Sequence, residues 1–121
     1  MTTPSVLDQR VWEDLRALGG SEADALILEL ISMYLEDAPI QLEAIREAVR
    51  QSDRRAIAFH AHALRSPSAS LGGLGLAEAC AALEAGVDAI DSLSLESPQV
   101  QKLLAESEQV VEELRSMIRD L

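Results

Sequence analysis

The sequence has few residues of the kinds that build β-sheets. Its 121 residues include one Trp, one Tyr and one Phe, together with only six Gly and four Pro. Strands are enriched in aromatic and β-branched side chains, whereas Ala, Leu and Glu, which are abundant here, favour helices. The shortage of Gly and Pro also leaves few positions that would force a helix to end. An all-α fold is therefore expected.

Cysteines, basic side chains and long apolar runs are scarce as well. The one cysteine, Cys80, excludes an internal disulfide and a cysteine-based zinc site, which fits a reducing compartment. Ten Lys and Arg against 21 Asp and Glu give a net charge of −11, so nucleic acid and anionic membranes are unfavourable partners. No apolar run approaches the ~20 residues of a membrane span, and residues 1–4 lack signal-peptide features. We expect a cytoplasmic protein.

Apolar residues recur at helical spacing in five or six segments joined by short connections. Pro39 is predicted to interrupt the second segment, and Asp53 to cap a central helix over 54–71. A helix of about twenty residues follows the polar loop at 91–98. Composition does not shift along the chain, so residues 1–121 are expected to form a single domain. The pattern predicts an antiparallel up-and-down four-helix bundle with one or two additional short N-terminal helices.

Most catalytic signatures are missing from the chain. It has no phosphate-binding glycine loop, no nucleophile elbow and no His or Cys cluster at metal-ligand spacing. His60 and His62 are two residues apart, so on a helix they point about 200° apart and cannot share an ion. Cys80 lies on an apolar stripe, which indicates a buried, inert thiol. We expect no nucleotide or metal site, and hence no autonomous enzyme.

The central helix is the segment whose residues point to chemistry. At 100° per residue, His62 lies well off the apolar face, whereas His60 flanks that face and is expected to be a partly buried, hydrogen-bonded histidine. The predicted buried face consists of Ile57, Ala61, Leu64, Ser68 and Leu71.

Two features distinguish His62 from an ordinary exposed histidine. Arg65 follows three residues later, so its guanidinium can reach the space above the imidazole, and Arg54 and Arg55 add charge to the same helix. A positive spot beside an exposed imidazole suits transient capture of a phosphoryl group. Small side chains around His62 also allow another protein to approach closely. The expected partner-contact residues are Ala58, Phe59, Ser66 and Ala69.

The segment from Ala61 to Gly72, AHALRSPSASLG, resembles the signature of histidine-containing phosphotransfer (Hpt) domains. That signature reads Ala-His-x-Leu-Lys-Gly-Ser, then Ser or Ala, and ends in Leu-Gly. Further similarities are spread over most of the chain, at Leu18-Gly19-Gly20, at Tyr34 to Pro39, at Asp53, at Cys80 and at Leu83-Glu84.

The resemblance implies a four-helix bundle that carries a phosphoryl group between receiver domains of response regulators, or from a hybrid histidine kinase. His62 would accept the phosphoryl group through Nε2, and Arg65 stands where the family has the lysine that pairs with the phosphoryl oxygens. Glu84 matches the position whose side chain accepts a hydrogen bond from Nδ1–H and fixes the tautomer. The chain would need no cofactor of its own, because Mg²⁺ would come from the receiver domain. It would act as a monomer.

Two departures from the signature lie just after His62. Ser66 replaces a glycine, and Pro67 replaces a serine in mid-helix, where it removes a backbone donor from the Ala63 carbonyl. We expect the helix to continue through Pro67 with a bend and His62 to stay accessible. The Ala63 carbonyl would then be satisfied by water or by a side-chain hydroxyl, with Ser66 and Ser68 as the nearest candidates. Two other readings remain open: an acidic helical interaction module, or degenerate Hpt domain, without phosphotransfer, and a helical hydrolase or metal protein.

Overall fold

The computed structural model describes residues 5–121, and over this range the chain is helical, without strands. The helices are α1 (Gln9–Gly19), α2 (Ala23–Arg50), α3 (Arg54–Ser70), α4 (Leu74–Gly86) and α5 (Pro98–Arg119), with single 3₁₀ turns η1 (Gly20–Glu22) and η2 (Val87–Ala89). The predicted all-α class is confirmed. The expectation that residues 1–4 carry no signal peptide concerns residues outside this range.

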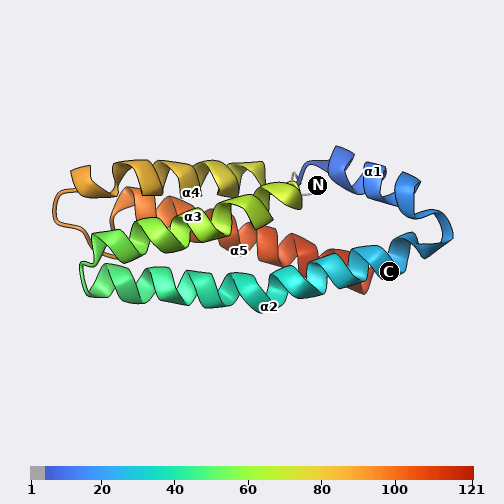
Figure 1. Ribbon diagram of the computed structural model, residues 1–121, viewed down its shortest axis with the longest axis horizontal. Helices are drawn as coiled ribbons and strands as arrows, with labels where there is room; N and C mark the ends of the chain where they lie inside the picture. The colour runs from blue at the N-terminus through green and yellow to red at the C-terminus, as the bar shows by residue number, and fades with distance from the viewer. Residues whose placement is uncertain (1–4) are drawn as a thin grey trace.

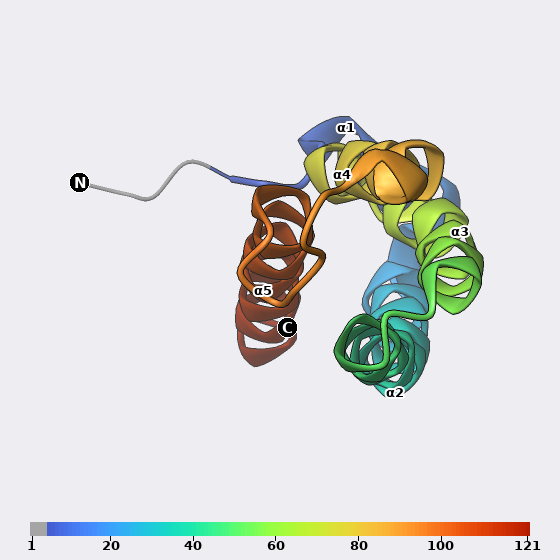
Figure 2. The same ribbon diagram turned by 90° about the vertical axis from the view of Figure 1, so that its left-hand side faces the viewer.

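The four longest helices form the bundle, and each packs against the next along the chain. In the end-on view of Figure 2, α2, α3, α4 and α5 surround a common interior, with α3 between α2 and α4. The short α1 packs on the N-terminal part of α2 and extends beyond the bundle in Figure 1. This is the predicted four-helix bundle with one short N-terminal helix. None of the helices within residues 5–121 combines the length and apolar character needed to cross a bilayer.

The core of the bundle is built almost entirely from aliphatic side chains. Each helix of the bundle contributes one apolar face, and burial of such faces is what stabilises helices in water. The aromatic residues divide, since Trp12 and Tyr34 are buried whereas Phe59 is exposed. The largest fully buried side chains include Ile27, Ile31, Ile45, Ile57, Leu64, Leu76, Leu83, Leu103 and Leu114.

The predicted interruption at Pro39 is wrong, because α2 runs through this residue without a break. Pro39 itself is exposed, while its neighbours Ala38 and Leu42 are buried. The buried positions keep one helical register from Ile27 to Val49, so a break would remove half of them from the core. Burial of several aliphatic side chains, each worth about 1.5–3 kcal/mol, outweighs the roughly 3 kcal/mol that a mid-helix proline costs.

Helix α3 agrees with the prediction at both ends and along its buried face. The Asp53 side chain accepts a hydrogen bond from the Ala56 backbone N–H and thereby caps the first turn. At the other end, the N–H of Gly73 donates to the Ser68 carbonyl at 2.8 Å. The expected face is buried throughout: Ile57, Ala61, Leu64, Ser68 and Leu71.

The helix also continues through Pro67, as predicted, and ends at Ser70. A buried side-chain hydroxyl supports this turn. Ser68 Oγ donates to the Leu64 carbonyl at 2.8 Å, and it lies 2.9 Å from the hydroxyl of Tyr34 on α2. Because the serine proton is used on Leu64, Tyr34 is the donor to Ser68. The Ser68 hydroxyl, one of the two predicted candidates for the Ala63 carbonyl, thus serves the Leu64 carbonyl instead.

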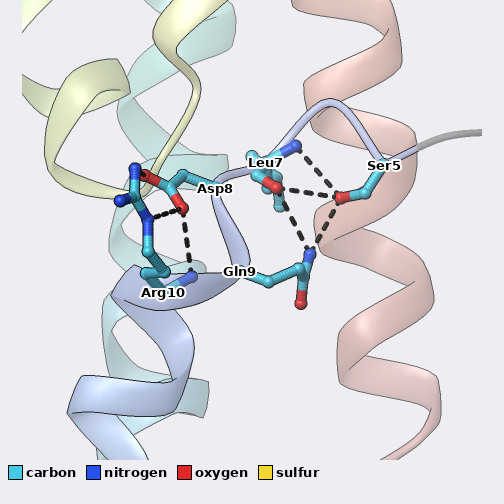
Figure 3. A network of polar contacts seen from close by, with 5 residues as sticks. All are labelled: Ser5, Leu7, Asp8, Gln9 and Arg10. Atoms are coloured by element: carbon cyan, nitrogen blue, oxygen red, sulfur yellow. Dashed lines mark hydrogen bonds and ion pairs between the residues drawn. The ribbon is translucent and has the colours of Figure 1, made fainter.

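Residues 5–8, which precede α1, form hydrogen bonds to α1, to α5 and to the turn between α3 and α4. Ser5 Oγ and the backbone N–H of Val6 donate to the Glu113 carboxylate on α5. Figure 3 shows the neighbouring contacts, in which Gln9 Nε2 donates to Ser5 Oγ and Arg10 pairs with Asp8. The Asp8 N–H in turn donates to the Gly72 carbonyl at 2.8 Å.

Replacing Gly72 by alanine is expected to destabilise the fold by about 1–2 kcal/mol. Gly72 has a φ of +85°, and an added Cβ would stand 2.8 Å from the Asp8 backbone nitrogen. Urea denaturation of G72A measures the loss. The matched control is G86A, because Gly86 has open space around its Cβ position and a negative φ. An equal loss of stability in the two variants would contradict this explanation.

Candidate functional site

His62 projects from α3 toward α4 and stays open to solvent. Its side chain is 70% exposed, and Nδ1 lies 2.9 Å from Glu84 Oε1 and 3.1 Å from Oε2. A carboxylate only accepts hydrogen bonds, so the ring proton belongs on Nδ1 and the neutral imidazole keeps its lone pair on Nε2. The structure therefore brings His62 and Glu84 together from two helices, and within residues 5–121 no hydrogen bond engages Nε2.

His60 has a different environment, on the side of α3 that faces α2. It is half-buried, Nδ1 donates to Gln41 Oε1 at 2.7 Å, and the Phe59 ring contacts it edge-on with centroids 5.1 Å apart. The expected partly buried, hydrogen-bonded histidine is confirmed. The two histidines bond to different neighbouring helices, as their spacing predicted. No simple sequence pattern pointed to Gln41, which is 19 residues earlier.

Arg65 lies one turn beyond His62 and is exposed. Its charge reaches the base of the site, as the environment of Cys80 shows. Burial raises the pKa of the Cys80 thiol to about 12, while the Arg65 charge opposes this rise and the Glu84 charge adds to it. Cys80 is fully buried, in agreement with the prediction of an inert thiol. Arg65 on α3 and Glu84 on α4 are thus both close enough to Cys80 for their charges to act on its thiol.

The expected contribution of Arg54 to a positive spot beside His62 is wrong. Its guanidinium donates to the carbonyl of Val87 and, at 2.9 Å, to that of Ile90. Arg54 therefore satisfies backbone acceptors at the end of α4 and η2 rather than facing the imidazole. The sequence predicted that Arg54 lies on this helix, but only the packing of α3 against η2 shows which groups its side chain binds.

The surface around His62 is small and partly apolar. Phe59 is 67% exposed, Ser66 is exposed, and Ala58 and Ala69 are half-buried. All four lie on α3 outside its buried face, as the helical spacing of the sequence predicted. A large exposed aromatic ring beside small side chains is a favourable composition for the centre of a protein interface.

A family model described as "Hpt domain" matches residues 29–121, which include α3, α4 and α5 and most of α2. The chain belongs to the Hpt family. Hpt domains are phosphocarriers of two-component phosphorelays that work with response regulators and kinases, and this protein is such a carrier rather than an enzyme of the usual kind. No observation favours the alternative of an interaction module without phosphotransfer.

A solved structure has the same fold. The crystal structure of histidine-containing phosphotransfer protein B (HptB) from Pseudomonas aeruginosa PAO1 superposes with a TM-score of 0.78, over 98% of this chain and 99% of that chain. The two sequences are 20% identical, so this likeness speaks to the fold. Among curated proteins, no match to this chain was found.

Proposed function

We propose that His62 is the residue of this Hpt protein that carries the phosphoryl group. The observation that supports this most strongly is the exposed imidazole whose Nδ1–H is held by Glu84. A nucleophile oriented by a second side chain is the usual arrangement for group transfer. His60 lacks this combination, because its ring is half-buried between α3 and α2.

In the proposed reaction, Nε2 of His62 attacks the phosphorus of an aspartyl phosphate on a receiver domain. The N–P bond forms as the P–O bond to the aspartate breaks, and the aspartate leaves as a carboxylate. The imidazole gains positive charge while its proton stays on Nδ1, and the Glu84 carboxylate stabilises that charge. Transfer onward to another receiver domain is the reverse reaction.

Arg65 is proposed to pair with the phosphoryl oxygens once they are bound to Nε2. An arginine in the place of the family's lysine keeps the charge and adds a second N–H for bidentate pairing. The receiver domain would dock over Ala58, Phe59, Ser66 and Ala69 and would supply Mg²⁺ from its own site. No cofactor of the chain itself is proposed.

The remaining proposals concern the protein as a whole. We propose that residues 1–121 act as one monomeric domain in the cytoplasm, with no nucleic acid or membrane partner and no nucleotide site. The net charge of −11 supports the monomeric state and the absence of nucleic acid and membrane partners, because such a field repels phosphate backbones, anionic lipids and a second copy of the chain.

Phosphotransfer from a set of receiver domains tests the proposed function. Each receiver is phosphorylated on its aspartate, purified away from excess donor and mixed with this protein. The expected result is rapid loss of label from at least one receiver and its appearance on this chain in an acid-labile, base-stable form. Complete retention of label on every receiver tested, or an acid-stable product, would contradict the proposal.

Replacing Glu84 by alanine is expected to slow this transfer about fivefold without abolishing it. The imidazole loses its orienting acceptor but keeps its nucleophilic nitrogen, and a partly exposed pair is worth at most about 1 kcal/mol. Nitrogen NMR of His62 provides a second measurement, because E84A should show a mixture of tautomers. The control is E78A, which removes an exposed carboxylate from the same helix. Equal rates in the two variants would exclude Glu84 from the site.

A further inference from the structure

On the side of α3 away from Glu84, a groove of about 460 Å³ runs between α2 and α3. Its walls are mainly apolar, with Met33, Tyr34 and Ile40 on α2 and Leu64 and Pro67 on α3. Asp37 is the one charged residue among those that line it. We call this feature the α2–α3 groove. Ala63, which follows His62 directly, forms part of its wall.

Two hydrogen-bond acceptors in the α2–α3 groove lack a side-chain donor among residues 5–121. Asp37 is exposed, and no ion pair or hydrogen bond to its carboxylate is present in this part of the chain. The Ala63 carbonyl loses its usual helical partner, because that partner is residue 67 and proline has no N–H. Asp37 and Ala63 both line the groove, whose other walls are mainly apolar.

Two other polar side chains of the groove are already engaged. The Tyr34 hydroxyl bonds to Ser68, and the Gln41 carbonyl oxygen accepts from His60. An apolar cleft with a few convergent polar groups selects its ligand through those groups. The groups that remain are the Asp37 carboxylate, the Ala63 carbonyl, the Ser70 hydroxyl and the Gln41 amide nitrogen, and the carboxylate is the only charged group among them. The complementary ligand has an aliphatic stem and a positively charged head with several N–H donors, which describes a lysine or arginine side chain.

We infer that the α2–α3 groove binds a lysine or arginine side chain of the partner receiver domain and so helps to select that partner. The inference rests on the proposed function, because a receiver that reaches His62 also covers the residue next to it, Ala63. Charge complementarity supports a basic occupant, since Asp37 forms no ion pair within residues 5–121 and the whole protein carries a charge of −11. Pro67, which departs from the family signature, contributes by freeing the carbonyl.

The test compares D37N with E36Q in transfer from the receiver that serves the wild-type protein fastest. Glu36 is an exposed neighbour that does not line the groove, so both variants change the net charge equally. For D37N we expect the KM for the receiver to rise about tenfold, as for loss of a charge-assisted hydrogen bond, with kcat unchanged. For E36Q we expect a change of less than about twofold, as for an exposed surface charge.

Two further measurements separate the groove from the rest of the site. The rate of direct phosphorylation by phosphoramidate should be equal in D37N and wild type, because that small donor does not use the groove. P67A restores the donor to the Ala63 carbonyl and should also raise the KM. Equal KM values for D37N and E36Q, or a lower KM in D37N as expected for an apolar occupant, would refute the inference while leaving transfer through His62 intact. Absence of transfer from every receiver would instead refute the proposed function and this inference with it.

Discussion

The variant H62Q is expected to lose phosphoryl acceptance completely and to keep the stability of the wild-type fold. The amide of glutamine cannot form the N–P bond, so no label should pass from a phosphorylated receiver domain. The side chain of His62 is 70% exposed and lies outside the buried face of α3. Surface replacements of this kind change the free energy of unfolding by about 0.5 kcal/mol or less. Receiver dephosphorylation and urea denaturation measure the two effects.

The control for H62Q is H60Q, which changes the other histidine of the chain in the same way. We expect H60Q to accept label at a rate close to that of wild type. It should lose some stability, because the hydrogen bond between His60 and Gln41 is half-buried. Normal labelling of H62Q, or loss of labelling in H60Q alone, would transfer the assignment to His60.

Replacing Arg65 by alanine is expected to reduce the transfer rate by about 10- to 100-fold. The guanidinium forms hydrogen bonds to the phosphoryl group that exist only when phosphate is being transferred or held, and such charge-assisted bonds are worth about 1.5–3 kcal/mol. The phosphorylated histidine should also hydrolyse faster in R65A. Rapid-quench kinetics give the rate, and decay of label on the isolated protein gives the lifetime.

Arg55 offers a matched comparison, because it is exposed on the same helix and its loss changes the net charge equally. We expect R55A to transfer at nearly the wild-type rate and R65K to retain most activity. If R55A and R65A slowed transfer to the same extent, Arg65 would act only through the general field of the helix.

The position of His62 was predictable because it depends on one helix. Asp53 marks where α3 begins, and the spacing of Ile57, Ala61 and Leu64 fixes which face is buried. From these residues alone, His62 had to lie outside the core. The burial of Cys80 followed from the same reasoning applied to α4.

Features that depend on contacts between helices were harder to predict. The bond from His62 to Glu84 joins residues 22 positions apart, and only the family resemblance pointed to it. No sequence pattern predicted that Arg54 donates to carbonyl groups near η2, because the acceptors are backbone atoms that any residue could supply.

Proline caused the one wrong prediction about a helix boundary. The rule that proline ends a helix is local, whereas the burial that keeps α2 intact comes from the whole bundle. Pro39 and Pro67 both lie inside continuous helices. At Pro67 the prediction was correct, because Leu71 shares one helical face with Ile57 and Leu64 and a break at Pro67 would have moved it off that face.

The most direct test of the account is to locate the phosphoryl group on the wild-type protein after transfer from a receiver domain. Phosphorus and nitrogen NMR of the ¹⁵N-histidine-labelled chain identify both the residue and the ring nitrogen that carry it. The account predicts one phosphohistidine, at Nε2 of His62, with the proton retained on Nδ1 beside Glu84. Phosphate on Nδ1 of His62, on His60 or on an acidic side chain would contradict it.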